Sequence, residues 1–253
     1  METGAITSHI DVAQMVLYGF WIFFAGLVFY LHREDKREGY PIETEGAHVM
    51  KFSGFPDMPS PKVYDMPHGG GTRVAPKAED PQYELDGEPT APYPGSPLTP
   101  KGDGVGSNIG PGSYAIRPET PDLTWDGKPR IQPLRVATAH GLDARDPDPR
   151  GKPVWGADGE QGGTVTDVWV DLAEPLIRYL EIDVGGRSAL LPINFCRISK
   201  DGVRVQSILG KHFANAPGTA NPDQVTLQEE DKAAAYFGSG TLYATPERAE
   251  PWL

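Results

Sequence analysis

Cysteine is almost absent from this chain of 253 residues, which contains only Cys196. A single cysteine cannot form an internal disulfide, and no Cys/His spacing typical of a zinc site is present. Basic residues are also few, with 23 Lys and Arg against 35 Asp and Glu and a net charge of −12. This acidic balance excludes nucleic acid as a natural partner of the soluble part and disfavours anionic lipid there, because both would repel it.

Catalytic motifs are lacking as well. Residues 68–71 (HGGG) resemble the oxyanion loop of some esterases, but the chain has no G-x-S-x-G elbow, so a tight turn containing His68 is predicted instead. The glycines of residues 102–110 lack dinucleotide-binding spacing, and the aspartates of residues 143–148 favour a solvated loop over a calcium site. We therefore expect no active site, no metal and no cofactor bound by this chain alone.

Charge is missing altogether from residues 12–31, VAQMVLYGFWIFFAGLVFYL. Twenty helical residues span about 30 Å, the thickness of a bilayer core. A cleaved signal peptide is disfavoured because residues 1–11 contain no Lys or Arg, and a buried core helix is disfavoured because there is no polar stripe. We predict a single membrane-spanning helix at 12–31.

The flanking charges predict the orientation of this helix. Arg33, Lys36 and Arg37 follow the apolar run, whereas residues 1–11 carry no basic side chain. The positive-inside rule then places residues 32–253 in the cytoplasm and residues 1–11 in the periplasm. Residues 32–53 form a membrane-exit segment in this interpretation.

Glycine and proline occupy 23 of the 59 positions from residue 54 to residue 112, which excludes regular helix and central strand. A disordered linker and an extended arm laid over a partner both fit this composition. Apolar residues that a linker would not need favour the arm: Phe52, Phe55, Val63, Tyr64, Met66, Leu85, Tyr93, Ile109 and Tyr114. We assign the arm to residues 54–131.

The segment 132–253 has a different pattern. Strand-like runs rich in β-branched residues occupy 164–171, 176–184, 188–193, 195–198 and 203–205, separated by turn pairs such as Gly185-Gly186 and Asp201-Gly202. These short strands predict a small antiparallel barrel or sandwich. Thr226 and Glu229 have capping-box spacing, which predicts a short C-terminal helix over 229–236 that Gly238 and Gly240 end.

Carboxylates are the only chemistry that this folded part offers: Asp167, Asp171, Glu174, Glu181, Asp183, Glu229, Glu230 and Asp231. Such side chains are usually solvated surface groups. The alternative is a proton relay, since clustered carboxylates raise one another's pKa toward neutrality.

Several short motifs, in this order along the chain, carry a resemblance: Tyr30-Leu31, Arg33-Glu34-Asp35, Arg37-Glu38-Gly39-Tyr40-Pro41, Pro67-His68-Gly69, Asp103-Gly104-Val105-Gly106, Val168-Trp169-Val170-Asp171, Glu229-Glu230-Asp231-Lys232 and Gly240-Thr241-Leu242-Tyr243-Ala244. With these motifs the chain resembles the H subunit of the purple-bacterial photosynthetic reaction centre. The resemblance implies a cytoplasmic PRC-type β-barrel that caps two pigment-binding subunits in the inner or chromatophore membrane. Bacteriochlorophyll, bacteriopheophytin, quinones and non-haem iron would lie on those partners. An antenna ring, a cytochrome subunit and membrane lipids are further candidate partners.

The resemblance also implies roles for individual residues. Glu174 matches a glutamate on the proton path to the secondary quinone, with Asp171 and Arg178 beside it. Glu230 corresponds to a further polar residue near this path. Candidate interface residues are Tyr30, Arg33, Arg37, Tyr40, His68 and Arg130.

One departure from the family pattern concerns the entry of protons. Some members carry Asp-x-His-x-His, a proton entrance that also binds inhibitory zinc or cadmium, where this chain has residues 124–128 (TWDGK). Lysine titrates far above neutral pH and would shuttle protons poorly. We expect entry at Asp122, Asp126 or His140 instead. The alternative function is a membrane-tethered assembly or scaffold protein with no proton role.

Overall fold

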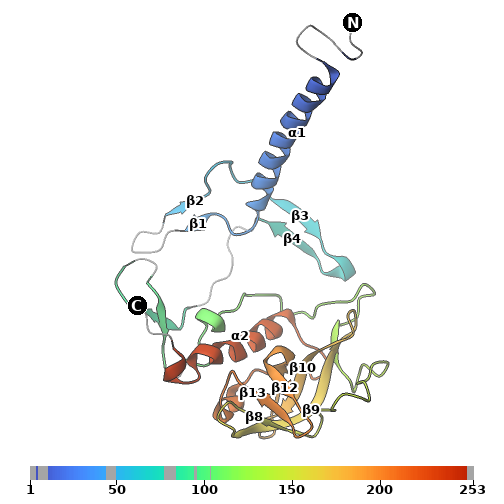
Figure 1. The fold of residues 1–253 in the computed structure, drawn as a ribbon, viewed down its shortest axis with the longest axis vertical. Coiled ribbons are helices and arrows are strands. Elements are labelled where there is room, and N and C mark those ends of the chain that lie inside the picture. Colours follow the sequence, from blue (N-terminus) through green and yellow to red (C-terminus); the bar gives the residue numbers. More distant parts are fainter. Residues whose placement is uncertain are drawn as a thin grey trace. The chain divides into compact units, whose positions relative to one another are not determined.

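The computed structural model describes residues 4, 11–43, 50–76, 84–93, 96–102 and 104–249. Most of the predicted periplasmic segment 1–11, and Asp103 of one family motif, lie outside these ranges. The chain forms two compact units (Figure 1): an N-terminal unit of residues 1–80 with 93–95, and a barrel unit of residues 81–92 with 96–253. Each unit is described by itself.

Helix α1, Val12–Asp35, is the longest element of the N-terminal unit. The side chain of Asp11 caps it by accepting a hydrogen bond from the Gln14 backbone N–H at 2.7 Å. None of its residues is buried within the chain, and the helix is long and apolar enough to cross a membrane. It continues four residues past the predicted span 12–31, because the charged residues after Leu31 are also good helix formers.

Two small antiparallel sheets follow α1 in this unit. Strands β1 (Ile42–Glu43) and β2 (Lys51–Phe52) pair with each other, and β3 (Lys62–Asp65) pairs with β4 (Thr72–Ala75). The predicted tight turn containing His68 is confirmed: it joins β3 to β4, and His68 has the left-handed backbone angle φ 57°.

The barrel unit is built on a curled seven-stranded sheet with strand order β11-β10-β9-β8-β13-β12, and β7 pairs with β9. The strands are β7 (Ile131–Pro133), β8 (Pro153–Trp155), β9 (Gln161–Asp171), β10 (Leu176–Asp183), β11 (Ser188–Pro192), β12 (Cys196–Ile198) and β13 (Val203–Val205). The predicted mostly-β barrel-like fold is confirmed. The pairing is not purely antiparallel, however, since β13 lies parallel to β8. A separate pair, β5 (Gly87–Pro89) with β6 (Leu98–Pro100), precedes this sheet.

Alternation along β9 gives the sheet two buried faces. Val168 and Val170 join the main core with Leu180 and Ile182, and Trp169 points to a second, smaller cluster with Ile131, Tyr179, Leu190 and Val225. The alternation is interrupted at one point: the register with β10 shifts near Thr166, and Val165 joins the main core although it lies an even number of residues from Trp169.

Helix α2, Leu227–Tyr243, packs against this sheet (Figure 1). The capping box is confirmed: the Thr226 hydroxyl accepts from the Glu229 N–H at 3.2 Å, and the Glu229 carboxylate accepts from the Thr226 N–H at 2.8 Å. The predicted end of the helix at Gly238 and Gly240 is wrong. A Cβ at Gly240 would lie 2.3 Å from the Ser207 carbonyl oxygen, so this glycine serves close packing inside the helix.

The segment 54–131 is divided between the two units, and its described part contains no α-helix and no strand of the large sheet before Ile131, where β7 begins. Of the apolar residues that favoured an arm, Ile109 is buried, whereas Phe55 is 82% exposed and Val63 is 65% exposed. That the exposed residues contact a partner stays a prediction.

Candidate functional site

A buried carboxylate lies at the centre of the candidate site. Asp171 is the last residue of β9, and its side chain has no exposed surface. Arg130 Nε donates to both carboxylate oxygens, at 3.0 and 2.9 Å. The backbone N–H groups of Ala173 and Glu174 donate to Asp171 Oδ1 at 2.9 and 3.1 Å. The carboxylate therefore stabilises the turn that leaves β9, as aspartates commonly do where a strand ends.

Arg130 links Asp171 to two further acids. Its Nη1 lies 3.4 Å from Asp122, and its Nη2 lies 3.5 Å from Glu174 Oε1. Strand pairing sets this position, because Arg130 directly precedes β7 and its carbonyl accepts from the Leu172 N–H at 2.8 Å. Glu174 is otherwise open, with 64% of its side chain exposed.

Arg178, on β10, extends the cluster toward helix α2. Its Nη1 lies 3.9 Å from Asp171, and its Nη2 lies 3.8 Å from Glu230 Oε2. The Tyr179 hydroxyl donates to the same Glu230 oxygen at 2.8 Å. Ion pairs thus run without a break from Glu174 through Arg130, Asp171 and Arg178 to Glu230. We call this set, with Asp122 and Tyr179, the acid–arginine chain.

Within the acid–arginine chain, the pKa values of Asp171 and Glu230 shift in opposite directions. Burial by itself would raise the pKa of Asp171, but hydrogen bonds from Arg130 and from the Glu174 and Ala173 N–H groups lower that pKa below its usual value. Burial raises the pKa of Glu230, and the opposing effects of Tyr179 and Arg178 are smaller. Asp171 therefore stays ionised, whereas Glu230 holds its proton more readily than an ordinary glutamate.

Asp126 does not join the acid–arginine chain. It lies in the turn closed by the Leu123–Pro129 bridge, where its carboxylate is 2.8 Å from Lys128 Nζ and accepts from the Thr124 hydroxyl at 2.5 Å. Lys128 and Thr124 lower the pKa of Asp126 to about 2. His140 is also outside the acid–arginine chain, and its Nδ1 is buried without a hydrogen-bond partner among the described residues.

A second charged cluster escaped the sequence interpretation. Arg135 Nη1 lies 3.2 Å from Asp167 and 2.6 Å from Glu181, and the Trp169 indole N–H donates to Glu181 at 2.9 Å. Asp223 contacts the same arginine at 3.2 Å. Asp167, Trp169 and Asp171 stand at every second position of β9. This alternation was the sequence signal that the three side chains share one face of the strand.

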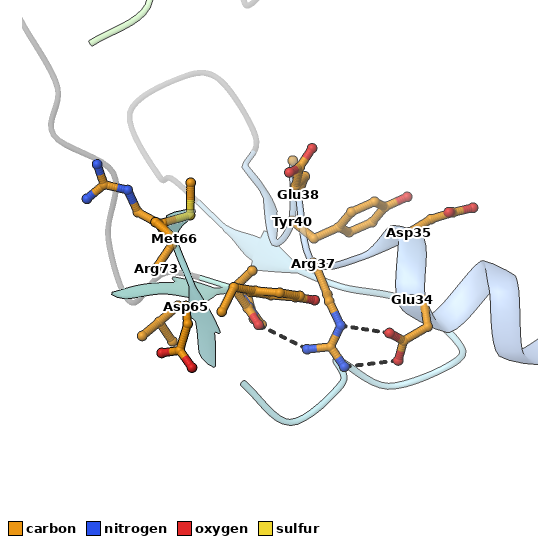
Figure 2. Close-up of a pocket in the computed structure, with 13 residues that line it drawn as sticks. Glu34, Asp35, Arg37, Glu38, Tyr40, Asp65, Met66 and Arg73 are labelled. Atoms are coloured by element: carbon orange, nitrogen blue, oxygen red, sulfur yellow. Dashed lines mark hydrogen bonds and ion pairs between the residues drawn. The ribbon is translucent and has the colours of Figure 1, made fainter. Parts of the chain in front are cut away.

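Two of the interface candidates in the N-terminal unit, Arg37 and Tyr40, line a groove at the end of α1, and Figure 2 shows Arg37 at its centre. Arg37 donates to Glu34 through Nε and Nη2, at 2.9 Å each, and through Nη1 to the carbonyls of Ser60 and Ala75 at 2.6 and 2.9 Å. Lys62 also contacts Glu34. Arg37 therefore fixes its own unit rather than presenting a free cation.

The remaining candidates differ in exposure. Tyr30, Arg33 and His68 are exposed. Tyr40 lies with its ring 5.3 Å from Lys36 Nζ, and Lys36 is buried. No pattern in the sequence predicted the burial of this lysine. Among the described residues, no group of three or more His, Cys, Asp or Glu side chains is placed to hold a metal ion.

Two protein-family models match the chain. The model of the photosynthetic reaction centre H-chain N-terminal region matches residues 4–136, which is more than half of the chain. The PRC-barrel domain model matches residues 143–211, which contain six of the seven strands of the large sheet. The chain therefore belongs to the H-chain family of photosynthetic reaction centres and is a membrane-anchored subunit of such a complex with a PRC-barrel domain.

Proposed function

We propose that this subunit stabilises the two pigment-binding subunits and conducts protons from the cytoplasm to the secondary quinone that they hold. The observation that carries the proposal is the acid–arginine chain, in which two arginines connect Glu174, Asp171 and Glu230. Proton conduction needs groups that exchange protons near neutral pH and that lie close enough to pass them on, directly or through water.

In this proposal the three acids Glu230, Glu174 and Asp171 of the acid–arginine chain have different roles. Glu230 is suited to carry a proton, because burial raises its pKa. Glu174 is placed to meet water or a partner, because 64% of its side chain is exposed and Arg130 holds it by an ion pair at 3.5 Å. Asp171, with its lowered pKa, acts as a positioning residue that holds Arg130 and Arg178 between the two glutamates.

The topology belongs to the same proposal. The basic residues after the apolar run support a cytoplasmic location for residues 32–253 in the inner or chromatophore membrane. The pigments, quinones and non-haem iron lie on the partner subunits. Tyr30, Arg33, Tyr40 and His68 are the candidate contacts with those partners, and an antenna ring or a cytochrome subunit would be further neighbours.

A scaffold role without proton conduction is the second candidate. The full pairing of Asp171 and Arg37 within the chain favours it, because both side chains stabilise local structure. The two functions differ in stoichiometry. A conducting subunit should co-purify one-to-one with the mature pigmented complex, whereas an assembly scaffold should dissociate from it.

The kinetic test uses Glu174→Gln in the assembled complex. Because the variant cannot carry a proton at this position, the proton-coupled second electron transfer to the secondary quinone should slow about tenfold or more, within the range expected for loss of a proton-transfer group. The first transfer should stay near the wild-type rate. Flash-induced absorbance changes measure both.

Asp143→Asn is the matched control, because it also removes one carboxylate charge, in an exposed loop where Arg145 lies 2.7 Å from Asp143 and lowers its pKa. Its second electron transfer should match the wild type. An unchanged rate in Glu174→Gln, with the complex intact, would remove Glu174 from the proton path.

A further inference from the structure

Phe55 is the most exposed phenylalanine of the N-terminal unit, and it lies against the membrane-spanning helix. Its side chain is 82% exposed, in the loop between β2 and β3. Its ring centroid lies 5.8 Å from that of Phe29, which belongs to the apolar run 12–31. Phe29 precedes the end of that run by two residues, or about 3 Å of helix.

Lys36 holds the loop in this position. It is only 2% exposed, and its ammonium group donates to the carbonyl oxygens of Ser53 and Pro56, on either side of Phe55. A buried ammonium group needs such partners, because its desolvation is costly. Gly54 has φ 63°, a backbone angle at which residues other than glycine are strained, and this angle lets the loop curl around the lysine.

These contacts fix the depth of Phe55 relative to the span. A residue whose ring contacts Phe29 lies at the level of the bilayer when α1 crosses it, while Lys36 and its carbonyl partners lie at the polar end of the helix. Removal of the large apolar surface of a phenylalanine side chain from water is a favourable contribution to the free energy. Aqueous exposure of Phe55 beside an apolar helix would forgo this contribution.

We propose that Phe55 inserts among the lipid acyl chains of the cytoplasmic leaflet, as a second apolar anchor beside α1. Continuity argues for lipid as the occupant, because Phe55 extends the apolar surface of a helix none of whose residues is buried by the described part of the chain. The shape of the loop agrees: a single ring projects between the small polar residues Ser53, Gly54 and Asp57, as in an interfacial wedge. Phe52, 51% exposed on β2, would lie nearer the interface.

Spin labelling of the assembled complex in phosphatidylcholine nanodiscs tests this proposal. A nitroxide is attached at Phe55→Cys in a Cys196→Ser background, and its relaxation by oxygen, which partitions into lipid, is compared with that by a water-soluble nickel chelate. Val63→Cys is the matched control: Val63 is 65% exposed in the same unit, and its neighbour Lys62 contacts Glu34 beyond the apolar run.

The oxygen-to-nickel ratio should be several-fold higher at position 55 than at position 63. A nickel-accessible label at 55 would overturn the proposal, and a label reached by neither reagent would overturn it in favour of a partner subunit as the occupant. Lys36→Met, which removes the two loop contacts, should move the label at 55 toward nickel accessibility. A label that stays in lipid in the Lys36→Met variant would show that the contacts of Lys36 with Ser53 and Pro56 do not hold the loop in place.

Discussion

Arg130 Nε donates hydrogen bonds to both oxygens of the Asp171 carboxylate, at 3.0 and 2.9 Å, and that carboxylate is fully buried. This pair joins the segment before β7 to the end of β9. It also brings Glu174 and Asp122 to one side of a shared guanidinium, while Arg178 reaches Asp171 from β10. Under the proposed function, the stability of the barrel unit and proton conduction depend on the same contacts.

Asp171→Asn should lower the free energy of unfolding by about 2–3 kcal/mol, since it removes a charged partner of Arg130 and leaves its hydrogen bonds weaker. Chemical denaturation of the full chain in detergent measures this change. Asp143→Asn is the control, because Asp143 pairs with an exposed arginine, Arg145, at 2.7 Å, and the loss of such a surface pair should leave the stability almost unchanged. Equal losses in the two variants would contradict the structural role of Asp171.

Stability should depend on pH with opposite signs at Asp171 and Glu230. The pKa of Asp171 is lowered in the folded chain, so its contribution is present above its unfolded pKa of about 3.9 and is lost as the pH falls. The pKa of Glu230 is raised, so its contribution is complete below about pH 4.3 and is lost as the pH rises through the folded pKa. Wild type should therefore lose stability relative to Glu230→Gln as the pH rises above about 4.3. Denaturation midpoints of the two proteins over pH 4–8 test this, and parallel curves would contradict it.

Micromolar zinc or cadmium should leave quinone protonation unchanged. The turn at residues 124–128 offers Asp126 and Lys128 where some family members have histidines, and Asp126 is already paired with that lysine. Flash-induced proton uptake with and without the metal measures the effect. The double variant Asp126→His with Lys128→His should gain metal sensitivity, because imidazole is a good zinc ligand. Inhibition of the wild type would show that another cluster takes the metal.

Gly240→Ala should destabilise the barrel unit by about 2 kcal/mol, within the range for overpacked sites. Alanine favours a helix by about 1 kcal/mol over glycine, but its Cβ would lie 2.3 Å from the Ser207 carbonyl oxygen and 2.4 Å from Ile208 Cγ2. Gly141→Ala is the control, because a Cβ there meets no atom within 4 Å. Thermal unfolding of the two variants gives the comparison, and equal midpoints would contradict the packing role of Gly240.

The elements that depend on local pattern were predictable from the sequence. The uncharged run 12–31 predicted α1, the alternation of β-branched residues predicted β9 to β13, and the spacing of Thr226 and Glu229 predicted the start of α2. Each of these signals depends on neighbours within a few residues, since a hydrogen-bonded turn or the alternation of a strand is set locally. Two local interpretations failed for reasons that lie elsewhere in the chain: Gly240 packs against Ser207 instead of ending a helix, and β13 pairs in parallel with β8.

The sequence by itself determined an apolar span, a Gly- and Pro-rich segment, a β domain and a stock of carboxylates that includes Glu174, Asp171 and Glu230. Only the tertiary structure decided which of these acids share an arginine, and whether burial and ion pairing raise or lower the pKa of each. Asp171 and Glu230 are 59 positions apart, and Arg130 and Arg178 reach Asp171 from two other segments. Burial and ion pairing depend on distances of a few ångströms between such segments, and spacing along the chain does not encode those distances.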